Sequence, residues 1–361
     1  MKILYLSLYD SRYPMGGAEK VLLDISTGMH RVYGDQAAAC VNDGDLMGQV
    51  STAGLKTFLI HREKYKTFLT LNSLRRAIQE FKPDIIHSHH RFTSFLADIF
   101  FKHKAVLIHT EHVLRSDKAF FFRYGHKVTA VHESVRNQLI RAYRVPACDS
   151  VTIPNAVALP APVSARVESL RDRYGRVAGE VRVLCVGRLE EQKGHRYLVE
   201  AVMRLPESYR QRLRVFIAGE GRLKEEIQDQ IRTLRLEHNF CFLGHVSDIE
   251  TYLEFCDFLV LPSLWEGMPL VILEAFSMGK AVLATDIPGT RETLIQGETG
   301  QLVASRSAGA LGQALMKWMD EPEKISQMGV QAKKYSMNSF SFQTMLRRYH
   351  ELYESLLKAQ V

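Results

Sequence analysis

The chain has 361 residues, of which 46% are hydrophobic and 24% are charged. This composition is typical of globular proteins and excludes collagen-like, intrinsically disordered and disulfide-scaffold proteins. Its five cysteines are widely scattered without C-x-x-C spacing, so neither a disulfide framework nor a zinc site is predicted. No run of about 18 apolar residues occurs, so we expect no membrane-spanning helix. The cysteine usage fits a reducing cytosol, and we expect a cytoplasmic protein.

The formal net charge of +7 lies entirely in the N-terminal half of the chain. Residues 1–160 carry 21 Lys and Arg against 14 Asp and Glu, whereas the remainder is balanced. Such a one-sided excess suggests an anionic partner for that half, such as a membrane surface, a nucleic acid or a phosphorylated substrate.

Short apolar runs alternate with segments of helical periodicity along the first half. The apolar start of the chain is too short for a secretory signal and is expected to be a buried strand. The expected strands are Ile3–Leu8, Ala37–Val41, Thr57–Ile60, Asp84–His87, Ala105–His109 and Lys127–Val131. The expected helices are Ala18–His30, Phe68–Phe81, Phe92–Lys102 and Ser134–Tyr143.

The second half repeats this alternation. Its expected strands are Val181–Val186, Arg214–Ala218, Phe240–Leu243, Phe258–Leu261 and Ala281–Thr285. Its expected helices are His195–Leu205, Lys224–Leu236, Ile249–Phe255, Leu270–Met278 and Ala308–Met319. Apolar strands joined by helices predict parallel sheets covered on both sides. The predicted fold class is therefore α/β, with two doubly wound Rossmann-like domains facing a cleft.

Prolines followed by a charged stretch place the boundary between the domains near residues 153–179. We predict one domain of residues 1–160 and a second domain of residues 161–340. A last helix, at about residues 341–361, has no strand after it and is expected to pack back on the first domain.

The densest motif lies in Pro262–Ala275, which follows an expected strand and enters a helix. Pro269 suits the first helical turn, and Gly267 lets a ligand approach the backbone closely. The free amides at the start of this helix form a ready anion site. Glu266 before the helix and Glu274 within it flank these amides, which suits a phosphorylated sugar. Taken alone, the same pair is equally consistent with a helix cap and a solvated side chain.

This segment resembles the C-terminal signature of the GT-B retaining glycosyltransferases of family 4. The resemblance implies that Glu266 contacts hydroxyls of the donor sugar and that Glu274 holds the nucleotide ribose. It also implies that the second domain binds the nucleotide sugar, whereas the first domain faces the acceptor. The resemblance assigns the diphosphate to the backbone around Gly267, Met268, Pro269, Leu270 and Val271.

The stretch from Val183 to Gly194 resembles the strand and loop "G-R-L…K-G" of the same family. Arg188 and Lys193 on this loop can neutralise a leaving diphosphate, although a pair of solvated loop cations would look the same. If these cations and the helix amides share the charge, no metal is needed. We therefore expect neither a metal nor another cofactor.

Three glycine-containing turns also match the family. The resemblance places Gly16 and Gly17 beside the donor diphosphate, and Gly219 near the phosphates or the ribose. It places Val246 at the nucleobase, where its backbone would bind a uracil. As bare patterns these turns indicate only changes of chain direction. The first is not G-x-G-x-x-G, so a nicotinamide cofactor is not indicated.

Histidines cluster at the ends of two expected strands. The Thr-Glu-His turn ending at His112 resembles the family's "T-x-H", whose histidine contacts the transferred sugar. Glu111 and His89 are candidates for the acceptor side. So is Asn155, in a segment that resembles "P-N-G-V" at the hinge but has alanine in place of glycine. A metal site among the histidines is a weaker alternative.

The resemblance implies retaining transfer of a sugar from a nucleotide-diphosphate sugar, expected to be a UDP-sugar. The acceptor is expected to be a glycan or a lipid-linked molecule in the synthesis of polysaccharide, lipopolysaccharide or glycolipid. No carboxylate nucleophile is evident, so front-face substitution is favoured. The expected catalytic residues of this transfer are Glu266, His112, Arg188 and Lys193. A UDP-sugar 2-epimerase and an inactive sugar-nucleotide-binding protein remain as alternatives.

Basic and apolar side chains alternate in residues 61–82, and basic and aromatic ones in residues 118–124. Both segments fit peripheral contact with an anionic membrane, expected at its inner face. A solvated helix face over a core stripe fits equally well. No nucleic-acid-binding module is present, so no nucleic-acid partner is expected.

Overall fold

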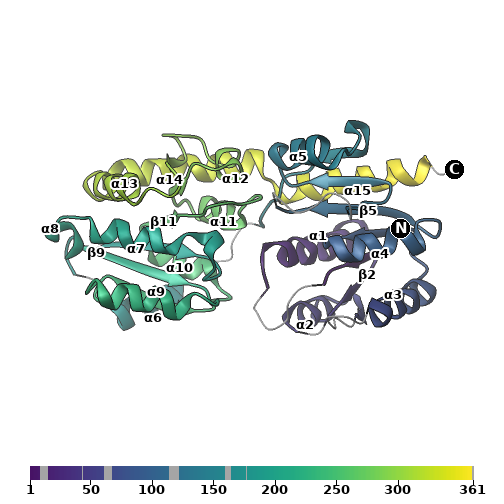
Figure 1. Cartoon of the computed structure of the whole chain (residues 1–361), viewed down its shortest axis with the longest axis horizontal. Coiled ribbons are helices and arrows are strands. Elements are labelled where there is room, and N and C mark those ends of the chain that lie inside the picture. The colour runs from purple at the N-terminus through teal and green to yellow at the C-terminus, as the bar shows by residue number, and fades with distance from the viewer. Residues whose placement is uncertain are drawn as a thin grey trace. The chain divides into compact units, whose positions relative to one another are not determined.

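The computed structural model describes residues 1–8, 15–42, 44–60, 67–113, 122–158, 164–175 and 177–359. The chain forms two compact units (Figure 1). Unit 1 contains Met1–Asn155 and Phe342–Val361, and unit 2 contains Ala156–Ser341. Within these described ranges, no helix is both long enough and apolar enough to cross a membrane.

Unit 1 is built on a seven-stranded parallel sheet in the order β3-β2-β1-β4-β5-β6-β7. Its inner strands are buried on both faces, so helices must cover both sides of the sheet. The strands are β1 (Lys2–Leu6), β2 (Gln36–Val41), β3 (Lys56–Leu59), β4 (Ile85–Ser88), β5 (Val106–Glu111), β6 (Lys127–Ala130) and β7 (Ser150–Thr152). The helices are α1 (Gly17–Tyr33), α2 (Asp45–Thr52), α3 (Thr67–Phe81), α4 (Arg91–Phe101), α5 (Glu133–Tyr143), the 3-10 helix η2 (Ala147–Asp149) and α15 (Phe342–Lys358).

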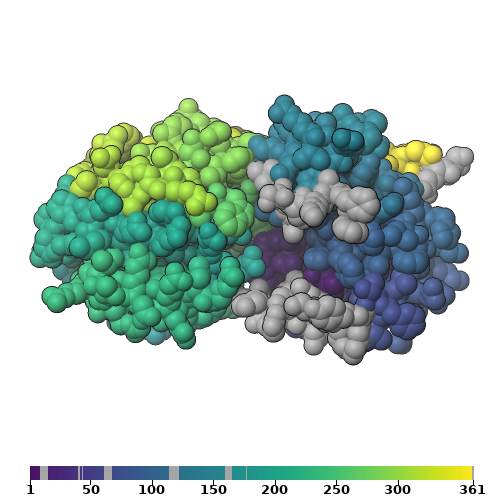
Figure 2. Space-filling view, viewed as in Figure 1, coloured from purple at the N-terminus to yellow at the C-terminus, as the bar shows by residue number. Residues whose placement is uncertain are grey.

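The C-terminal helix α15 belongs to unit 1, although the whole of unit 2 precedes it in the sequence. The hydroxyl of Tyr353 lies 2.7 Å from Nδ1 of His87 on β4, and Arg348 donates a hydrogen bond to the carbonyl of Thr152 on β7. In Figure 1 this yellow helix runs beside β5, and in Figure 2 atoms of earlier segments cover most of it. Its amphipathic pattern is therefore explained by a docking face on the first sheet.

Unit 2 is built on a six-stranded parallel sheet in the order β10-β9-β8-β11-β12-β13. Alternate residues of β8 face different cores, with Val183 and Cys185 on one side and Leu184 on the other. The strands are β8 (Val181–Val186), β9 (Leu213–Ala218), β10 (Phe240–Gly244), β11 (Phe258–Leu261), β12 (Val282–Thr285) and β13 (Gly300–Val303). The helices are α6 (Ser164–Tyr174), η3 (Glu191–Lys193), α7 (His195–Met203), α8 (Glu207–Arg210), α9 (Lys224–Thr233), α10 (Ile249–Phe255), α11 (Leu270–Ser277), α12 (Pro288–Arg291), α13 (Ala308–Asp320) and α14 (Pro322–Ser339).

The structure confirms the α/β class and the two doubly wound sheets, and each predicted element is found, with its ends either exact or shifted by a few residues. It also contains elements that the sequence patterns did not predict, among them α2, β7, β13 and α14. Residues 153–179, predicted as the domain boundary, contain helix α6. Its Arg166 forms an ion pair with Asp248 of unit 2. The chain passes from unit 1 to unit 2 at Asn155 and returns at Phe342.

Candidate functional site

The sheet order of unit 2 places its topological switch point between β8 and β11. The chain continues from β8 to β9 on one side and from β11 to β12 on the other. The loops after β8 and β11 therefore diverge at the carboxyl edge of the sheet, where doubly wound domains bind their ligands. Arg188 and Lys193 follow β8, and Glu266 follows β11. The topology thus brings two separate sequence motifs to one edge.

The carboxylate of Glu266 is the centre of this arrangement. It is buried, with 6% of the residue exposed. Its Oε1 accepts hydrogen bonds from Nζ of Lys193 at 2.5 Å and from Oγ of Ser263 at 2.7 Å, and its Oε2 accepts one from Nε2 of Gln192 at 3.3 Å. A buried carboxylate held by a cation and two neutral donors keeps a defined direction and does not act as a mere helix cap.

The two loops are also joined through their backbones. Leu264 donates its amide to the carbonyl of Gln192 at 2.7 Å, and the Gln192 side chain donates to the carbonyl of Trp265 at 3.0 Å. Gly194 has φ +64°, and a Cβ there would lie 2.1 Å from the carbonyl oxygen of Pro262. Only glycine permits this approach, so the "K-G" pair is needed to bring Lys193 to Glu266.

Helix α11 follows Glu266 in the chain and begins at Leu270. Pro269 is its N-cap, and every residue of the helix is buried, including Glu274 with 8% exposed. Among the described residues, no acceptor lies on the amides of Leu270 and Val271 in the first turn. Met268, just before the helix, is buried as well. Buried amides at a helix start are a favourable place for an anion.

The remaining donor-side predictions divide into an exposed cation and structural glycines. Arg188 is exposed, and its guanidinium forms no ion pair within the part of the chain that the structure describes. A Cβ on Gly219 would lie 2.0 Å from the carbonyl of Gly187, so packing alone requires this glycine. Gly267 is packed against Gly289, whose Cβ would lie 2.0 Å from the Gly267 carbonyl. Val246 is half-buried after β10 and packs on one of the two cores of unit 2.

In unit 1, Gly16 and Gly17 stand at the start of α1. The Gly16 amide donates a 3.0 Å hydrogen bond to Oε2 of Glu19, so a carboxylate already lies on this helix N-terminus. Residues 9–14, which connect β1 to this turn, lie outside the described residues.

The histidines meet at the carboxyl ends of β4 and β5. Nδ1 of His89 lies 3.0 Å from Nε2 of His112, and the two rings stack with centroids 5.1 Å apart. His89 is buried, with 6% exposed, whereas His112 is half-buried. His87 is fully buried between Tyr353 and Thr110, each at 2.7 Å. His89, predicted on the acceptor side, thus contacts His112 and is more deeply buried than His112.

Glu111 lies on the opposite face of β5 and is tied into an ion pair. Nε of Arg91 donates to its Oε2 at 2.5 Å, and Nε2 of His109 lies 3.5 Å away. Burial raises the pKa of the Glu111 carboxyl, but hydrogen bonding and charge from His109 and Arg91 lower it to about 2. This carboxylate is engaged by the protein itself. Asn155 is buried at the end of unit 1.

The described ranges contain no group of three or more His, Cys, Asp or Glu side chains arranged to hold a metal ion. The expected metal independence stays a prediction.

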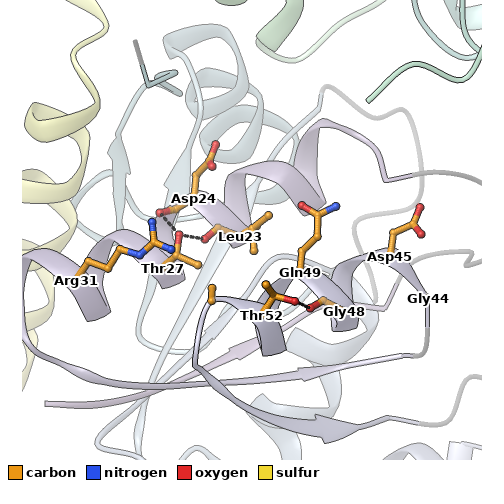
Figure 3. A pocket seen from close by; sticks show the side chains of 10 residues that line it. Leu23, Asp24, Thr27, Arg31, Gly44, Asp45, Gly48, Gln49 and Thr52 are labelled. Carbon is orange, nitrogen blue, oxygen red and sulfur yellow. Dashed lines mark hydrogen bonds between the residues drawn. The ribbon is translucent and has the colours of Figure 1, made fainter. Parts of the chain in front are cut away.

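A separate pocket of about 640 Å³ lies between α1 and α2 of unit 1 (Figure 3). The hydroxyls of Thr27 and Thr52 in its wall donate to the carbonyls of Leu23 and Gly48 on their own helices. None of the predicted site residues lines it.

Sequence reasoning missed several side chains that hold the predicted ones. Gln192 and Ser263 bind Glu266, Arg91 binds Glu111, and Tyr353 binds the histidine behind His89. For Gln192 and Ser263 a signal existed, because both are polar residues inside the two motif loops.

Comparisons with known proteins agree with the two halves of the molecule. Residues 167–335 match the family model described as Glycosyl transferases group 1, and residues 15–159 match the one described as Glycosyltransferase Family 4. An uncharacterized glycosyltransferase of Methanocaldococcus jannaschii is 26% identical over 254 residues, covering 64% of this chain and 62% of that protein. The chain thus spans less than two thirds of this relative's length.

A second relative is the UDP-Gal:alpha-D-GlcNAc-diphosphoundecaprenol alpha-1,3-galactosyltransferase of Escherichia coli. It is 27% identical over 309 residues, covering 80% of this chain and 79% of that enzyme. Among solved structures, Anabaena HepE in complex with UDP-glucose superimposes with a TM-score of 0.85 and 21% identity, over 98% of this chain and 100% of that chain. The structural likeness shows the fold, and the two family models together cover most of the chain. The protein therefore belongs to the glycosyltransferases of group 1 and family 4.

Proposed function

We propose that the protein is a retaining glycosyltransferase that uses a nucleotide-diphosphate sugar, with UDP-sugars as the preferred class. Its acceptor is a glycan or a lipid-linked molecule in the synthesis of a cell-surface polysaccharide, lipopolysaccharide or glycolipid. The name of the Escherichia coli relative supports both substrates, since it specifies UDP-Gal and a diphosphoundecaprenol acceptor. The Anabaena structure, which contains UDP-glucose, supports the donor class.

The observation that carries the proposal is the ion pair between the buried Glu266 and the half-buried Lys193. A sugar diphosphate needs acceptors for its hydroxyls and positive groups for its phosphates. The loops at the edge between β8 and β11 carry both, because Glu266 is hydrogen-bonded to Lys193 and the first amides of α11, at Leu270 and Val271, follow Glu266 in the chain. Without a donor, Glu266 neutralises Lys193. With a donor bound, we expect Lys193 to turn towards a phosphate.

In the proposed reaction, the acceptor oxygen bonds to the anomeric carbon on the face from which the diphosphate leaves. The bond between that carbon and the phosphate oxygen breaks, and the departing phosphate takes the proton of the acceptor hydroxyl. Lys193, Arg188 and the first amides of α11 stabilise the charge on the leaving group. Glu266 orients the sugar through its hydroxyls, which is catalysis by positioning. His112 is assigned to the transferred sugar, and Glu274 to the ribose.

Peripheral binding to the inner face of an anionic membrane is also proposed for unit 1. Phe68 on α3 is 70% exposed, and Arg75 and Arg76 on the same helix are exposed. Residues 61–66 and 118–121, which complete the two predicted segments, lie outside the described residues. Reversing both charges, R75E with R76E, should reduce flotation with anionic liposomes at low salt. Unchanged flotation of this variant would refute membrane contact through α3.

The donor site can be tested by tryptophan fluorescence, because the chain has only two tryptophans. Trp265 beside Glu266 is 39% exposed, whereas Trp318 is buried. UDP-sugars should change the emission of Trp265 in the wild type and in W318F, but not in W265F. GDP- and ADP-sugars serve as comparison donors.

Turnover then tests the assigned roles. Glu266→Gln should lower transfer or slow donor hydrolysis by about 100-fold or more while UDP still binds, and Arg188→Ala should weaken UDP binding. The exposed Glu298→Gln is the matched control. Wild-type turnover in Glu266→Gln would refute the proposed function. If an epimerised nucleotide sugar forms without an acceptor, the protein is an epimerase instead. If the protein binds the nucleotide sugar without any turnover, it is an inactive sugar-nucleotide-binding protein.

A further inference from the structure

His89 is the side chain of unit 1 whose position is least explained by its predicted role. It follows β4, with its amide donating to the Leu6 carbonyl at 2.8 Å, and only 6% of it is exposed. Its Nδ1 lies 3.0 Å from Nε2 of His112. The half-buried His112 is therefore more accessible to a ligand than the buried His89.

Burial and the neighbouring histidines His87, His112 and His109 hold the pKa of His89 well below its ordinary value. Its imidazole is therefore neutral at physiological pH and carries one proton, on either Nδ1 or Nε2. Nε2 is buried and, within the described ranges, has no hydrogen-bond partner. A proton on Nε2 would leave a buried N–H without an acceptor, which costs more than a buried lone pair without a donor. The geometry thus favours the proton on Nδ1, aimed at His112.

The residues behind His89 keep it in this place. His87 contacts it with ring centroids 4.4 Å apart and is itself fixed at both nitrogens, by the Tyr353 hydroxyl and by Thr110, each at 2.7 Å. Burial keeps His87 neutral as well, because it lowers the pKa of this residue well below the ordinary value. His89 therefore packs against an uncharged, immobile neighbour and has one strong polar contact, with His112.

We propose that His89 is a positioning residue that sets the tautomer of His112. Nδ1–H of His89 donates to Nε2 of His112, which leaves the proton of the neutral His112 ring on Nδ1. His112 then presents an N–H donor, in a fixed orientation, to an oxygen of the transferred sugar. This inference rests on the proposed function, in which His112 contacts that sugar. Without His89, Nε2 of His112 loses the donor that holds the ring in this tautomer.

Two isosteric variants separate this role from packing. His89→Asn keeps an N–H donor at the position of Nδ1, whereas His89→Leu has the same branching but no polar atom. Donor hydrolysis by His89→Leu should fall about tenfold in kcat with a nearly unchanged KM, and His89→Asn should restore most of it. A purely structural role predicts the opposite order, because an apolar side chain suits this buried position better than an amide. Thermal unfolding of both variants measures their relative stability separately from their activity.

The tautomer itself can be read without any turnover. Histidine-labelled ¹⁵N spectra of the full chain, assigned with His112→Gln, should show His112 protonated on Nδ1 in the wild type and on Nε2 in His89→Leu. Protonation of wild-type His112 on Nε2, or equal kcat in the two His89 variants, would overturn the inference. The expected tautomer in a wild type that transfers no sugar would instead refute the proposed function.

Discussion

The buried carboxylate of Glu111, which His109 and Arg91 hold in its charged form, should make unit 1 sensitive to acid, and one substitution should remove this sensitivity. The pKa of this buried carboxyl is about 2 in the folded protein, against an ordinary value of 4.5. The folded state thus binds fewer protons than the unfolded state between these values. The contacts of Glu111 with His109 and Arg91 therefore contribute their full stability above pH 4.5, and this stability is lost as the pH falls towards 2. The difference corresponds to about 3 kcal/mol at pH 7 and to about 1.4 kcal/mol at pH 3.

Glu111→Gln removes the charge but keeps an oxygen that can accept from Arg91. We expect unit 1 to lose about 3 kcal/mol at pH 7, since Arg91 stays partly buried without its counter-charge. The loss should shrink to less than half at pH 3. The matched control is Glu133→Gln on α5, a carboxylate whose side chain is 55% exposed and whose ion pair with Arg136 spans 3.5 Å. It should change stability by less than about 1 kcal/mol at either pH.

The two units can be followed separately in one urea titration of the full chain. Both tryptophans, Trp265 and Trp318, belong to unit 2, so their fluorescence reports that unit alone. Circular dichroism reports the helices of both units. The Glu111→Gln effect should appear in the dichroism and leave the fluorescence midpoint unchanged. An equal loss at pH 7 and at pH 3, or none at pH 7, would refute the low pKa of Glu111 that His109 and Arg91 produce.

Two further substitutions test the packing around the sites. Tyr353→Phe removes the partner of a buried histidine and should destabilise unit 1 by about 1–3 kcal/mol in urea unfolding, whereas Tyr209→Phe at the surface of unit 2 should have little effect. Wild-type stability of Tyr353→Phe would contradict the buried hydrogen bond. Gly289→Ala forces a Cβ to within 2.0 Å of the Gly267 carbonyl, so donor binding measured by tryptophan fluorescence should weaken, while Gly309→Ala, with nothing within 4 Å, should bind normally. Equal binding by both glycine variants would show that the loop tolerates displacement.

A strand could be predicted wherever an apolar run is bordered by charged or turn-forming residues. β8 was predicted to the residue, because Val181–Val186 stands between a charged stretch and a glycine. β7 was missed because it has three residues, two of them Ser150 and Thr152. β13 was missed because it opens on Gly300 and Gln301. Such short, polar edge strands are recognised only once the neighbouring strand is in place.

The site of unit 2 was predictable for a different reason. Its motifs are local, each following one strand, so their chemistry could be interpreted without knowing the order of the strands. The distance between them was not predictable. Lys193 meets Glu266 because β8 pairs with β11, a neighbour that is distant in the sequence, and because Gly194 fits beneath the Pro262 carbonyl.

The histidines of unit 1 show which additional information was needed. Side chains two residues apart along a strand share a face of the sheet, so His87 goes with His89, His109 with Glu111, and Thr110 with His112. This alternation could be predicted from the sequence, but the register between β4 and β5, which decides which of these side chains meet, could not. β4 and β5 pair with Ser88 opposite His109, and β5 continues to Glu111 rather than ending at His109 as predicted. This register puts Thr110 on His87 and His112 on His89, and it turns Glu111 to the other face. A register shifted by one residue would exchange these partners, so His89 can act on His112 only in the pairing found here.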